Sequence, residues 1–230
     1  MKYMKKLFCG LLIVLSLFII AGCDKETDGE KFKQEYEDLN GKTIGDTKYE
    51  YPKVEIDKDN AIKYASYDDV LELLTDGTGV IYLGYPNCPW CRSAVPALLD
   101  AADEVGIKEI YYINMENERD EIKVKEDGTL ETVKEGTEGY KKLLERLDNI
   151  LDEYTLTDIH GNVVSANEKR IYVPLVIFVR KGEIVGYHLD TVESQKNPFD
   201  GLDKKQKNEL MDIYVNYMHK VLGDICDSSC

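Results

Sequence analysis

A Cys-Pro-Trp-Cys tetrapeptide, Cys88 to Cys91, stands between an apolar run and a helical pattern. The run over 79–86 predicts a buried strand and the residues from Arg92 onward predict a helix, so the motif falls on a strand-to-helix turn. Unpaired N–H groups and the positive end of a helix dipole favour a thiolate at the first cysteine of such a turn. A thiolate attacks disulfides, and a second cysteine one turn later can resolve the mixed disulfide. The motif therefore predicts thiol–disulfide exchange, with Cys88 as nucleophile and Cys91 as resolving thiol.

The N-terminus predicts a targeting segment rather than part of the fold. Three lysines precede the apolar stretch Leu7 to Ile20, and small residues then lead into Cys23. This pattern resembles a bacterial lipobox, in which a peptidase cuts before the cysteine and lipid is attached to it. A membrane-spanning anchor is the alternative, but the apolar stretch is shorter than the roughly 20 residues that a span requires. We expect a lipoprotein signal peptide over 1–22, lipidation at Cys23, and anchoring at the extracytoplasmic face of a bacterial cell membrane.

The chain is strongly acidic, with a formal net charge of −15. Removal of residues 1–22 takes away three lysines and no acidic residue, which leaves −18. Nucleic-acid binding needs clustered basic side chains, so this class of partner is excluded. Direct electrostatic contact with anionic lipid is also disfavoured. The lipid anchor alone is expected to hold the protein at a membrane.

The segment after the signal peptide predicts a tether. Residues 23–55 are charged and show no sustained apolar period, which is typical of a flexible linker. A short helix near 30–39 is the alternative. Folded structure is then expected over 56–225, followed by a cysteine-containing tail over 226–230.

The pattern inside the expected domain alternates between strands and helices. Apolar runs and capping signals predict strands near 62–65, 79–86, 109–114, 171–180 and 183–189, and helices near 66–74, 92–105 and 203–222. The interval 116–170 contains an amphipathic stripe over 138–154 and a hairpin-like turn near 157–164. We expect it to be a largely helical insertion.

This order of elements resembles the thioredoxin superfamily over about residues 61–222. The resemblance rests on the motif at its turn, on Pro96 five residues after the second cysteine, and on Val173-Pro174 before a late strand. It implies an α/β, thioredoxin-like fold in which helices flank a central mixed β-sheet. It also implies a cis bond before Pro174, which would lie beside the first cysteine, while the backbone of Val173 would pair with an extended substrate segment.

Two features depart from that family. Many thioredoxins carry a buried acid six residues before the first cysteine, where this chain has Tyr82. The chain between Cys91 and Pro174 is also much longer than in compact members, and the excess falls in the insertion. We expect the insertion to shape substrate choice. Insertions also occur in thioredoxin-like lipoproteins of the bacteriocin transport accessory type, to which this chain is more loosely similar.

The inner residues of the motif, Pro89 and Trp90, are positioned to tune thiol pKa and redox potential. Trp90 offers either an apolar face to a substrate or local packing. A structural disulfide or half of a zinc site is the alternative for the motif, and zinc would require two further ligands. The three histidines, His160, His188 and His219, are isolated in the sequence. Neither a metal nor a cofactor is expected.

A second pair of cysteines, Cys226 and Cys230, ends the chain. Once Cys9 is lost with the signal peptide and Cys23 is lipidated, an even number of cysteines remains, as expected for an exported protein. The terminal pair fits a small disulfide that caps the last helix, a second redox pair that relays electrons to Cys88 and Cys91, or a metal site.

The sequence thus predicts a membrane-anchored, extracytoplasmic thiol–disulfide oxidoreductase that acts on protein or peptide thiols and disulfides and exchanges electrons with a redox partner protein. An accessory lipoprotein that binds an exported peptide without catalysis is the alternative, and a copper-handling protein is a third. Oxidase, reductase and isomerase activities are not distinguished, because direction depends on reduction potential and on partners.

Overall fold

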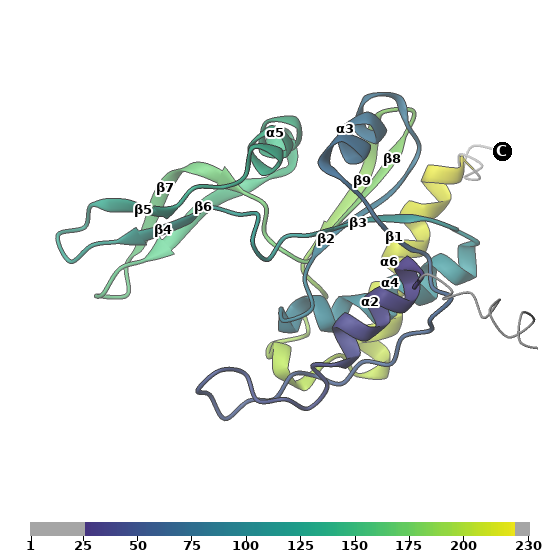
Figure 1. Cartoon of the computed structure of the whole chain (residues 1–230), viewed down its shortest axis with the longest axis horizontal. Coiled ribbons are helices and arrows are strands. Elements are labelled where there is room, and N and C mark those ends of the chain that lie inside the picture. Colours follow the sequence, from purple (N-terminus) through teal and green to yellow (C-terminus); the bar gives the residue numbers. More distant parts are fainter. Residues whose placement is uncertain (1–25, 224–230) are drawn as a thin grey trace, which may run out of the picture.

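The computed structural model describes residues 26–223 and builds them around one five-stranded mixed sheet. Its strands are β1 (Ile62–Tyr64), β2 (Gly79–Gly84), β3 (Ile110–Asn114), β8 (Leu175–Arg180) and β9 (Glu183–Leu189). The spatial order is β1-β3-β2-β8-β9, in which β1, β3 and β2 are parallel and β8 and β9 each run antiparallel to the preceding strand. The α/β class and the mixed sheet flanked by helices are confirmed (Figure 1).

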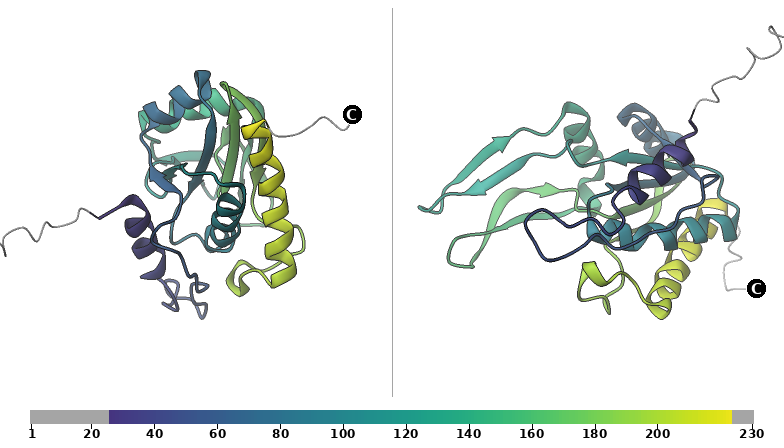
Figure 2. Two further views of the ribbon diagram at one scale, coloured as in Figure 1. Left: turned by 90° about the vertical axis from the view of Figure 1, so that its right-hand side faces the viewer. Right: turned by 60° about the horizontal axis from the view of Figure 1, so that its bottom comes forward.

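Helices cover both faces of this sheet (Figure 2). One face carries α2 (Asp28–Glu37), α4 (Pro89–Val105) and α6 (Lys204–Leu222), and the other carries α3 (Tyr67–Asp76) and α5 (Glu138–Leu147). Successive side chains of a strand point to opposite faces. Val80 and Tyr82 of β2 accordingly pack with the first group of helices, and Ile81 and Leu83 pack with the second.

Local capping chemistry sets the helix boundaries. Ser66 and Asp69 form a capping box at the start of α3, and Asp203 and Gln206 form one at the start of α6. Gly106 ends α4 in the left-handed conformation, with a φ of 82° that a residue without a Cβ adopts freely. These ends agree closely with the sequence expectation.

The N-terminal segment is folded, so the prediction of a flexible tether over 23–55 is wrong for its described part. The helix α2 places Phe32 and Tyr36, both 0% exposed, in the core between the sheet and α4. Val54 at the far end of the segment is also buried. The rest of α2 is polar. Two buried aromatic residues one turn apart are too few to show a helical period of apolar residues in the sequence. The folded domain begins near residue 28 rather than 56.

The interval 116–170 contains more strand than helix, so the prediction of a largely helical insertion is wrong. It contains two hairpins, which enclose α5 and a short 3-10 helix, η1 (Asp148–Ile150). The hairpins are β4 (Glu121–Val124) with β5 (Leu130–Lys134), and β6 (Asp152–Thr157) with β7 (Val163–Arg170). Their strands are short, largely exposed and rich in charged residues. Apolar alternation covers only two positions in β4 and two in β6, which is too few to identify a half-buried strand.

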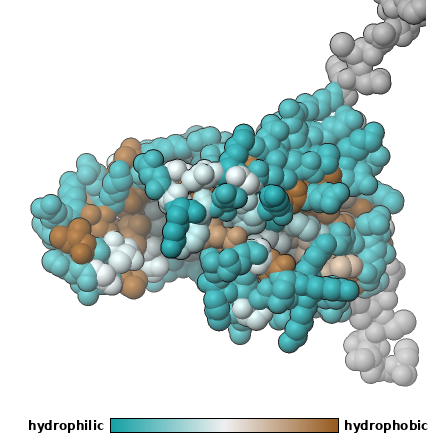
Figure 3. Space-filling model, turned by 90° about the horizontal axis from the view of Figure 1, so that it is seen from below, coloured by the Kyte–Doolittle hydropathy of each residue, from teal (hydrophilic) through white to brown (hydrophobic). Residues whose placement is uncertain are grey.

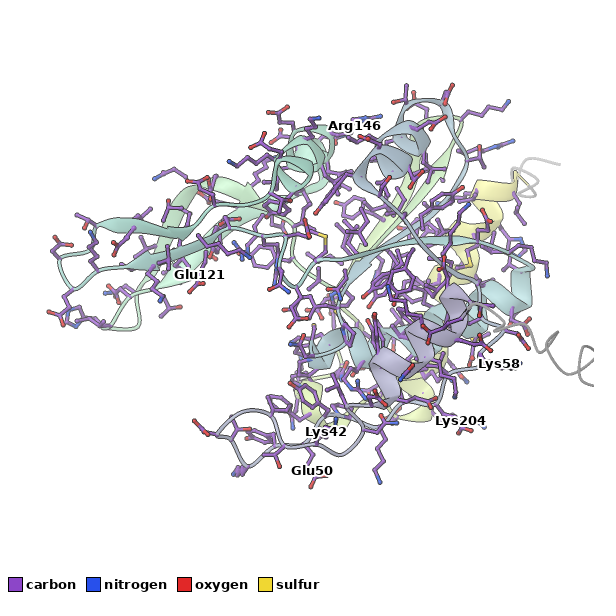
Figure 4. All side chains as sticks on the ribbon, in the orientation of Figure 1. Lys42, Glu50, Lys58, Glu121, Arg146 and Lys204 are labelled. Atoms are coloured by element: carbon purple, nitrogen blue, oxygen red, sulfur yellow. The ribbon has the colours of Figure 1, made fainter. Side chains whose placement is uncertain are left out.

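The two hairpins project from the body as an arm, which we define as residues 121–134 and 152–170 (Figure 1). Helix α5, which lies between the two hairpins in sequence, contacts the body of the protein. Its Arg146 lies against α3 and donates to the carbonyl of Leu74 (Figure 4). The arm leaves the end of the sheet at which β2 and β3 finish and β8 begins. The loop that leads to Cys88 starts at the same end.

The two ends of the described chain lie on the side of the body away from the arm (Figure 1). Cys23, Cys226 and Cys230 fall outside the described residues, so lipidation and the terminal pair stay predictions. Between residues 26 and 223, every helix is too short or too polar to cross a bilayer.

Candidate functional site

Cys88 stands at the junction of β2 and α4, where it is the N-cap residue of the helix. Its φ of −88° and ψ of 114° are extended, and its Sγ accepts a hydrogen bond from the backbone N–H of Cys91 at 3.3 Å. A sulfur atom thus takes the place that a serine or aspartate oxygen fills at other helix starts. The strand-to-helix turn is as expected, although the helix begins at Pro89 rather than at Arg92.

The two thiols of the motif are reduced and differ in their surroundings. The Cys91 thiol, as a hydrogen-bond donor, lowers the pKa of Cys88; the N–H groups of Cys91 and Trp90 and the Arg119 guanidinium act the same way against the effect of burial. Burial raises the pKa of Cys91 well above its ordinary value, and Cys88 adds to that rise. Cys88 keeps 6% of its surface exposed and Cys91 none. The arrangement favours the thiolate at Cys88 and the protonated thiol at Cys91.

The bond between Val173 and Pro174 is cis, as the resemblance implies. The carbonyl oxygen of Val173 lies 3.9 Å from the sulfur of Cys88 and accepts a weak S–H···O contact from it when Cys88 is in the thiol form. Pro174 is buried and Val173 is half-buried. The motif and the residues before β8, far apart in sequence, therefore share one surface, with the half-buried Pro89 and Trp90 in the first turn of α4 beside it.

Residues at the base of the arm make hydrogen bonds with the loop that leads to Cys88. The Asn87 amide donates to the Glu116 carboxylate at 2.6 Å, and the Arg119 guanidinium donates to the Tyr85 hydroxyl at 2.9 Å. The same guanidinium lies over the Tyr85 ring, 5.2 Å from its centroid. Sequence reasoning missed Arg119, because one basic residue in a polar insertion carries no sign of its place in space.

An ion pair closes the base of the arm. The Arg170 guanidinium lies 2.9 Å from the Asp120 carboxylate and also donates to the Asp120 carbonyl at 3.1 Å. The two side chains are only 11% and 14% exposed, and the guanidinium stacks 4.0 Å from the centre of the Tyr154 ring. The pair joins Asp120, where the chain enters the arm, to Arg170, where the chain leaves it three residues before Val173.

Arg92, directly after the second cysteine, is a buried charge at 1% exposure. Its guanidinium donates to four neutral oxygens: the carbonyls of Pro52 at 2.8 Å, Tyr36 at 2.7 Å and Pro86 at 3.2 Å, and the Asn40 side chain at 2.6 Å. Three of these acceptors belong to the N-terminal segment. Arg92 therefore fastens that segment to the start of α4, a role that the sequence did not reveal.

Tyr82 lies six residues before Cys88 in the sequence. It is fully buried on β2, and its hydroxyl lies 2.9 Å from the hydroxyl of Tyr36 on α2. A hydrogen bond from Tyr82 opposes the effect of burial and lowers the pKa of Cys91. A pair of phenols therefore stands behind the second cysteine.

Metal ligands do not gather in the part of the chain that the structure describes: no group of three or more His, Cys, Asp or Glu side chains between residues 26 and 223 is arranged to hold an ion. His188 has a structural partner, since its Nε2 lies 2.8 Å from the carbonyl oxygen of Thr191. His160 is exposed in the turn of the second hairpin.

No protein-family model matches the chain, and no curated protein matches it in sequence. The functional assignment therefore depends on the geometry of Cys88, Cys91 and Val173.

Proposed function

We propose that this protein is a thiol–disulfide oxidoreductase with a thioredoxin-like fold. One observation carries the proposal: the Cys88 sulfur lies between the N–H of Cys91 at 3.3 Å and the carbonyl of Val173 at 3.9 Å. The order of β2, α4 and β3, followed by the β8–β9 hairpin after a cis proline, supports the assignment of the fold.

The reaction proceeds by two exchanges. The Cys88 thiolate attacks one sulfur of a substrate disulfide, and the other substrate sulfur leaves as a thiolate and takes a proton from water. Cys91 then loses its proton and attacks the Cys88 sulfur, which releases the remaining substrate sulfur. The substrate gains two electrons and two protons, and the protein ends with a Cys88–Cys91 disulfide. The same steps in reverse oxidise a substrate dithiol, and reduction potentials set the direction.

The substrate is a polypeptide that presents its sulfur in an extended segment. The half-buried Val173 offers backbone groups beside the Cys88 sulfur, and Pro89 and Trp90 border the same place. Such a site would recognise the main chain of the substrate rather than one particular side chain, which suits protein or peptide thiols and disulfides. A redox partner protein that resets the pair would dock at the same surface.

The proposal includes a lipid anchor at Cys23, with the domain on the extracytoplasmic face of a bacterial membrane. Only a few residues separate Cys23 from the start of α2 at Asp28, so the folded domain would lie close to the bilayer. The described N-terminus lies away from the arm, so the redox site would face away from the membrane (Figure 1). Loss of labelling by a fatty-acid analogue in a Cys23→Ala variant tests this part.

Trapping in cells tests the enzymatic function. In a Cys91→Ala variant, a mixed disulfide on Cys88 has no resolving thiol, so covalent adducts with substrates should accumulate and disappear on reduction. The matched control is Cys88→Ser with Cys91→Ala, which should yield none. Equal recovery from both variants would contradict the proposal.

A second function, peptide binding without catalysis, is favoured by the free end of the arm. Two large apolar residues lie exposed at the turn of the second hairpin, Ile159 at 66% and Val163 at 74%. Figure 3 shows apolar surface at this end of the arm. A third residue, Val133, is 48% exposed on β5. Exposed apolar surface of this kind marks interaction sites. Partner binding that survives Cys88→Ser, with no thiol exchange in the parent protein, would favour this accessory role.

A further inference from the structure

Three buried polar side chains form one group next to the motif. Ser93, at 5% exposure, lies on α4 two residues after Cys91. Thr191 and Gln195, each at 6% exposure, lie in the loop that follows β9. A buried polar side chain costs free energy unless it is hydrogen-bonded. The hydrogen bonds of this group therefore show what it holds together.

The amide of Gln195 joins the three side chains. Its nitrogen donates to the Ser93 hydroxyl at 3.0 Å and to the Asn197 carbonyl at 3.4 Å, and its oxygen accepts from the Thr191 hydroxyl at 2.6 Å. The Asn197 carbonyl can only accept a hydrogen bond, which fixes the orientation of the amide. Gln195 therefore uses its oxygen and both N–H groups, and it connects the loop to the helix of the motif.

The same loop holds Pro174. The backbone N–H of Asp190 donates to the Pro174 carbonyl at 2.9 Å, and the backbone N–H of Thr191 donates to the Asp190 carboxylate at 3.0 Å. Asp190 has a φ of 70°, a conformation that side-chain-bearing residues keep only where their neighbours hold them. The His188 ring lies 2.8 Å from the Thr191 carbonyl oxygen. The start of the loop is thus fixed beside the docking backbone.

We propose that Gln195 is a positioning residue for the exchange reaction, which keeps the backbone of Val173 and Pro174 at a fixed place relative to Cys88. A path of hydrogen bonds and main chain connects the docking backbone to the helix of the motif: Pro174, Asp190, Thr191, Gln195 and Ser93. Gln195 acts through the loop and the helix rather than on a reacting sulfur. The inference rests on the proposed function and adds one residue to its machinery.

The spacing matters for a polypeptide substrate. The Val173 carbonyl oxygen lies 3.9 Å from the Cys88 sulfur. A substrate segment that pairs with the backbone of Val173 presents its own sulfur to Cys88 only while this spacing holds. Reaction rates fall by as much as about 10²-fold when reacting atoms are displaced by about 1 Å. A small disulfide makes no main-chain pairing, so its reaction does not depend on the loop.

Loss of the Gln195 amide would release the loop from α4. The hydroxyls of Thr191 and Ser93 would stay buried without their partner, a cost that the loop relieves by moving toward water. The docking backbone at Pro174 would move with the loop. The Cys88 sulfur would keep its place, because its hydrogen bond comes from within α4 itself.

Two reagents that release the same coloured thiolate test the inference. One is dithionitrobenzoate, a small aromatic disulfide, and the other is a cysteine peptide with blocked ends whose sulfur carries the same aromatic thiol. In both reactions the Cys88 thiolate attacks, a new S–S bond forms at Cys88, and the aromatic thiolate leaves with the electron pair of the broken bond. The ratio of the two second-order rate constants, peptide over small reagent, reports docking.

Gln195→Leu removes the amide and keeps much of the side-chain volume. We expect it to lower the ratio about tenfold by misplacing the docking backbone, while the rate with dithionitrobenzoate stays within about twofold of the parent's. Ser93→Ala, a smaller change within a helix, should lower the ratio in the same direction. The double variant should lower it no further than Gln195→Leu alone, because the two residues act in one path.

Met218→Ala is the matched control. Met218 is 0% exposed on α6, so its truncation should destabilise the protein, but it lies outside the path and should leave the ratio unchanged. A ratio unchanged in both Gln195→Leu and Ser93→Ala overturns the inference, and so does an equal fall in Met218→Ala. Failure of the parent protein to release the coloured thiolate from either reagent overturns the proposed function instead.

Discussion

The sulfur of Cys88 lies 3.9 Å from the carbonyl oxygen of Val173, a residue 85 positions later in the chain. The sheet order makes this contact possible, because β2 ends beside the start of its antiparallel neighbour β8. The arm is inserted between these two strands in sequence yet leaves their contact intact. Its hairpins instead extend outward from the same end of the sheet (Figure 1).

The first prediction concerns the folded N-terminal segment. Phe32 is 0% exposed, and its ring lies 4.4 Å from Tyr36 and 5.0 Å from Tyr112, measured between centroids. Phe32→Ala should lower the free energy of unfolding by about 3–5 kcal/mol, measured by urea denaturation. Val163→Ala, at a residue 74% exposed, should change it by less than about 0.5 kcal/mol. A neutral Phe32→Ala would mean that the segment is a tether after all.

The second prediction concerns Arg92. Substitution by methionine keeps much of the volume and removes the donor to the buried carbonyls of Tyr36 and Pro86 and to the half-buried carbonyl of Pro52, at about 1–3 kcal/mol for each that neither water nor another donor reaches. We expect a loss of at least about 3 kcal/mol and faster proteolytic cleavage between residues 40 and 56.

Lys207→Met is the matched control for Arg92. Lys207 pairs with Asp100 at 2.6 Å, but the two side chains are 37% and 49% exposed. Its loss should cost less than about 1 kcal/mol. Similar losses from both variants would contradict a special role for the buried guanidinium.

The third prediction concerns the base of the arm. A double-mutant cycle with Asp120→Asn and Arg170→Gln should give a coupling energy of about 1–3 kcal/mol, because both side chains are largely removed from water. The exposed pair of Lys63 and Glu109, 2.8 Å apart, should give less than about 1 kcal/mol. Equal coupling energies in the two cycles would show that burial does not strengthen the pair.

The fourth prediction follows from the lowered pKa of Cys88. A depressed native pKa adds stability that is complete above the unfolded value and is lost as pH falls through the native value. Between about pH 6 and about pH 7.5, Cys91 is largely protonated in both states. The unfolding free energy of the reduced protein, relative to Cys88→Ser, should therefore rise with pH in this window. A flat or falling difference would contradict the assigned direction of the shift.

Sequence reasoning was strongest where local patterns decide structure. The strand before Cys88, the helix after it and the turn at Lys181-Gly182 depend on apolar runs and on turn residues close together in the chain. The two cysteines are recognisable for the same reason, because a spacing of three residues at the start of a helix determines how their sulfurs lie relative to each other.

Sequence reasoning failed where partners are distant. Phe32 and Tyr36 are buried because a sheet and a helix formed by later residues cover them, and nothing in their polar neighbourhood signals this. The strands of the arm are short and rich in polar side chains, so apolar alternation spans only two positions in β4 and two in β6. Nothing in the sequence distinguishes Arg92 from a surface arginine, because its four acceptor oxygens come from the N-terminal segment and from the loop before Cys88.

Ionisation of Cys88 is the property on which exchange chemistry depends, and the pH dependence of its alkylation measures it most directly. Reduced protein is treated with limiting iodoacetamide across a range of pH, and the rate of adduct formation at Cys88 is followed by mass spectrometry. We predict a midpoint below about 8.5, the value of a free cysteine, with Cys91 unmodified over the same range. A midpoint at or above that value, or alkylation of both cysteines at equal rates, would contradict the account.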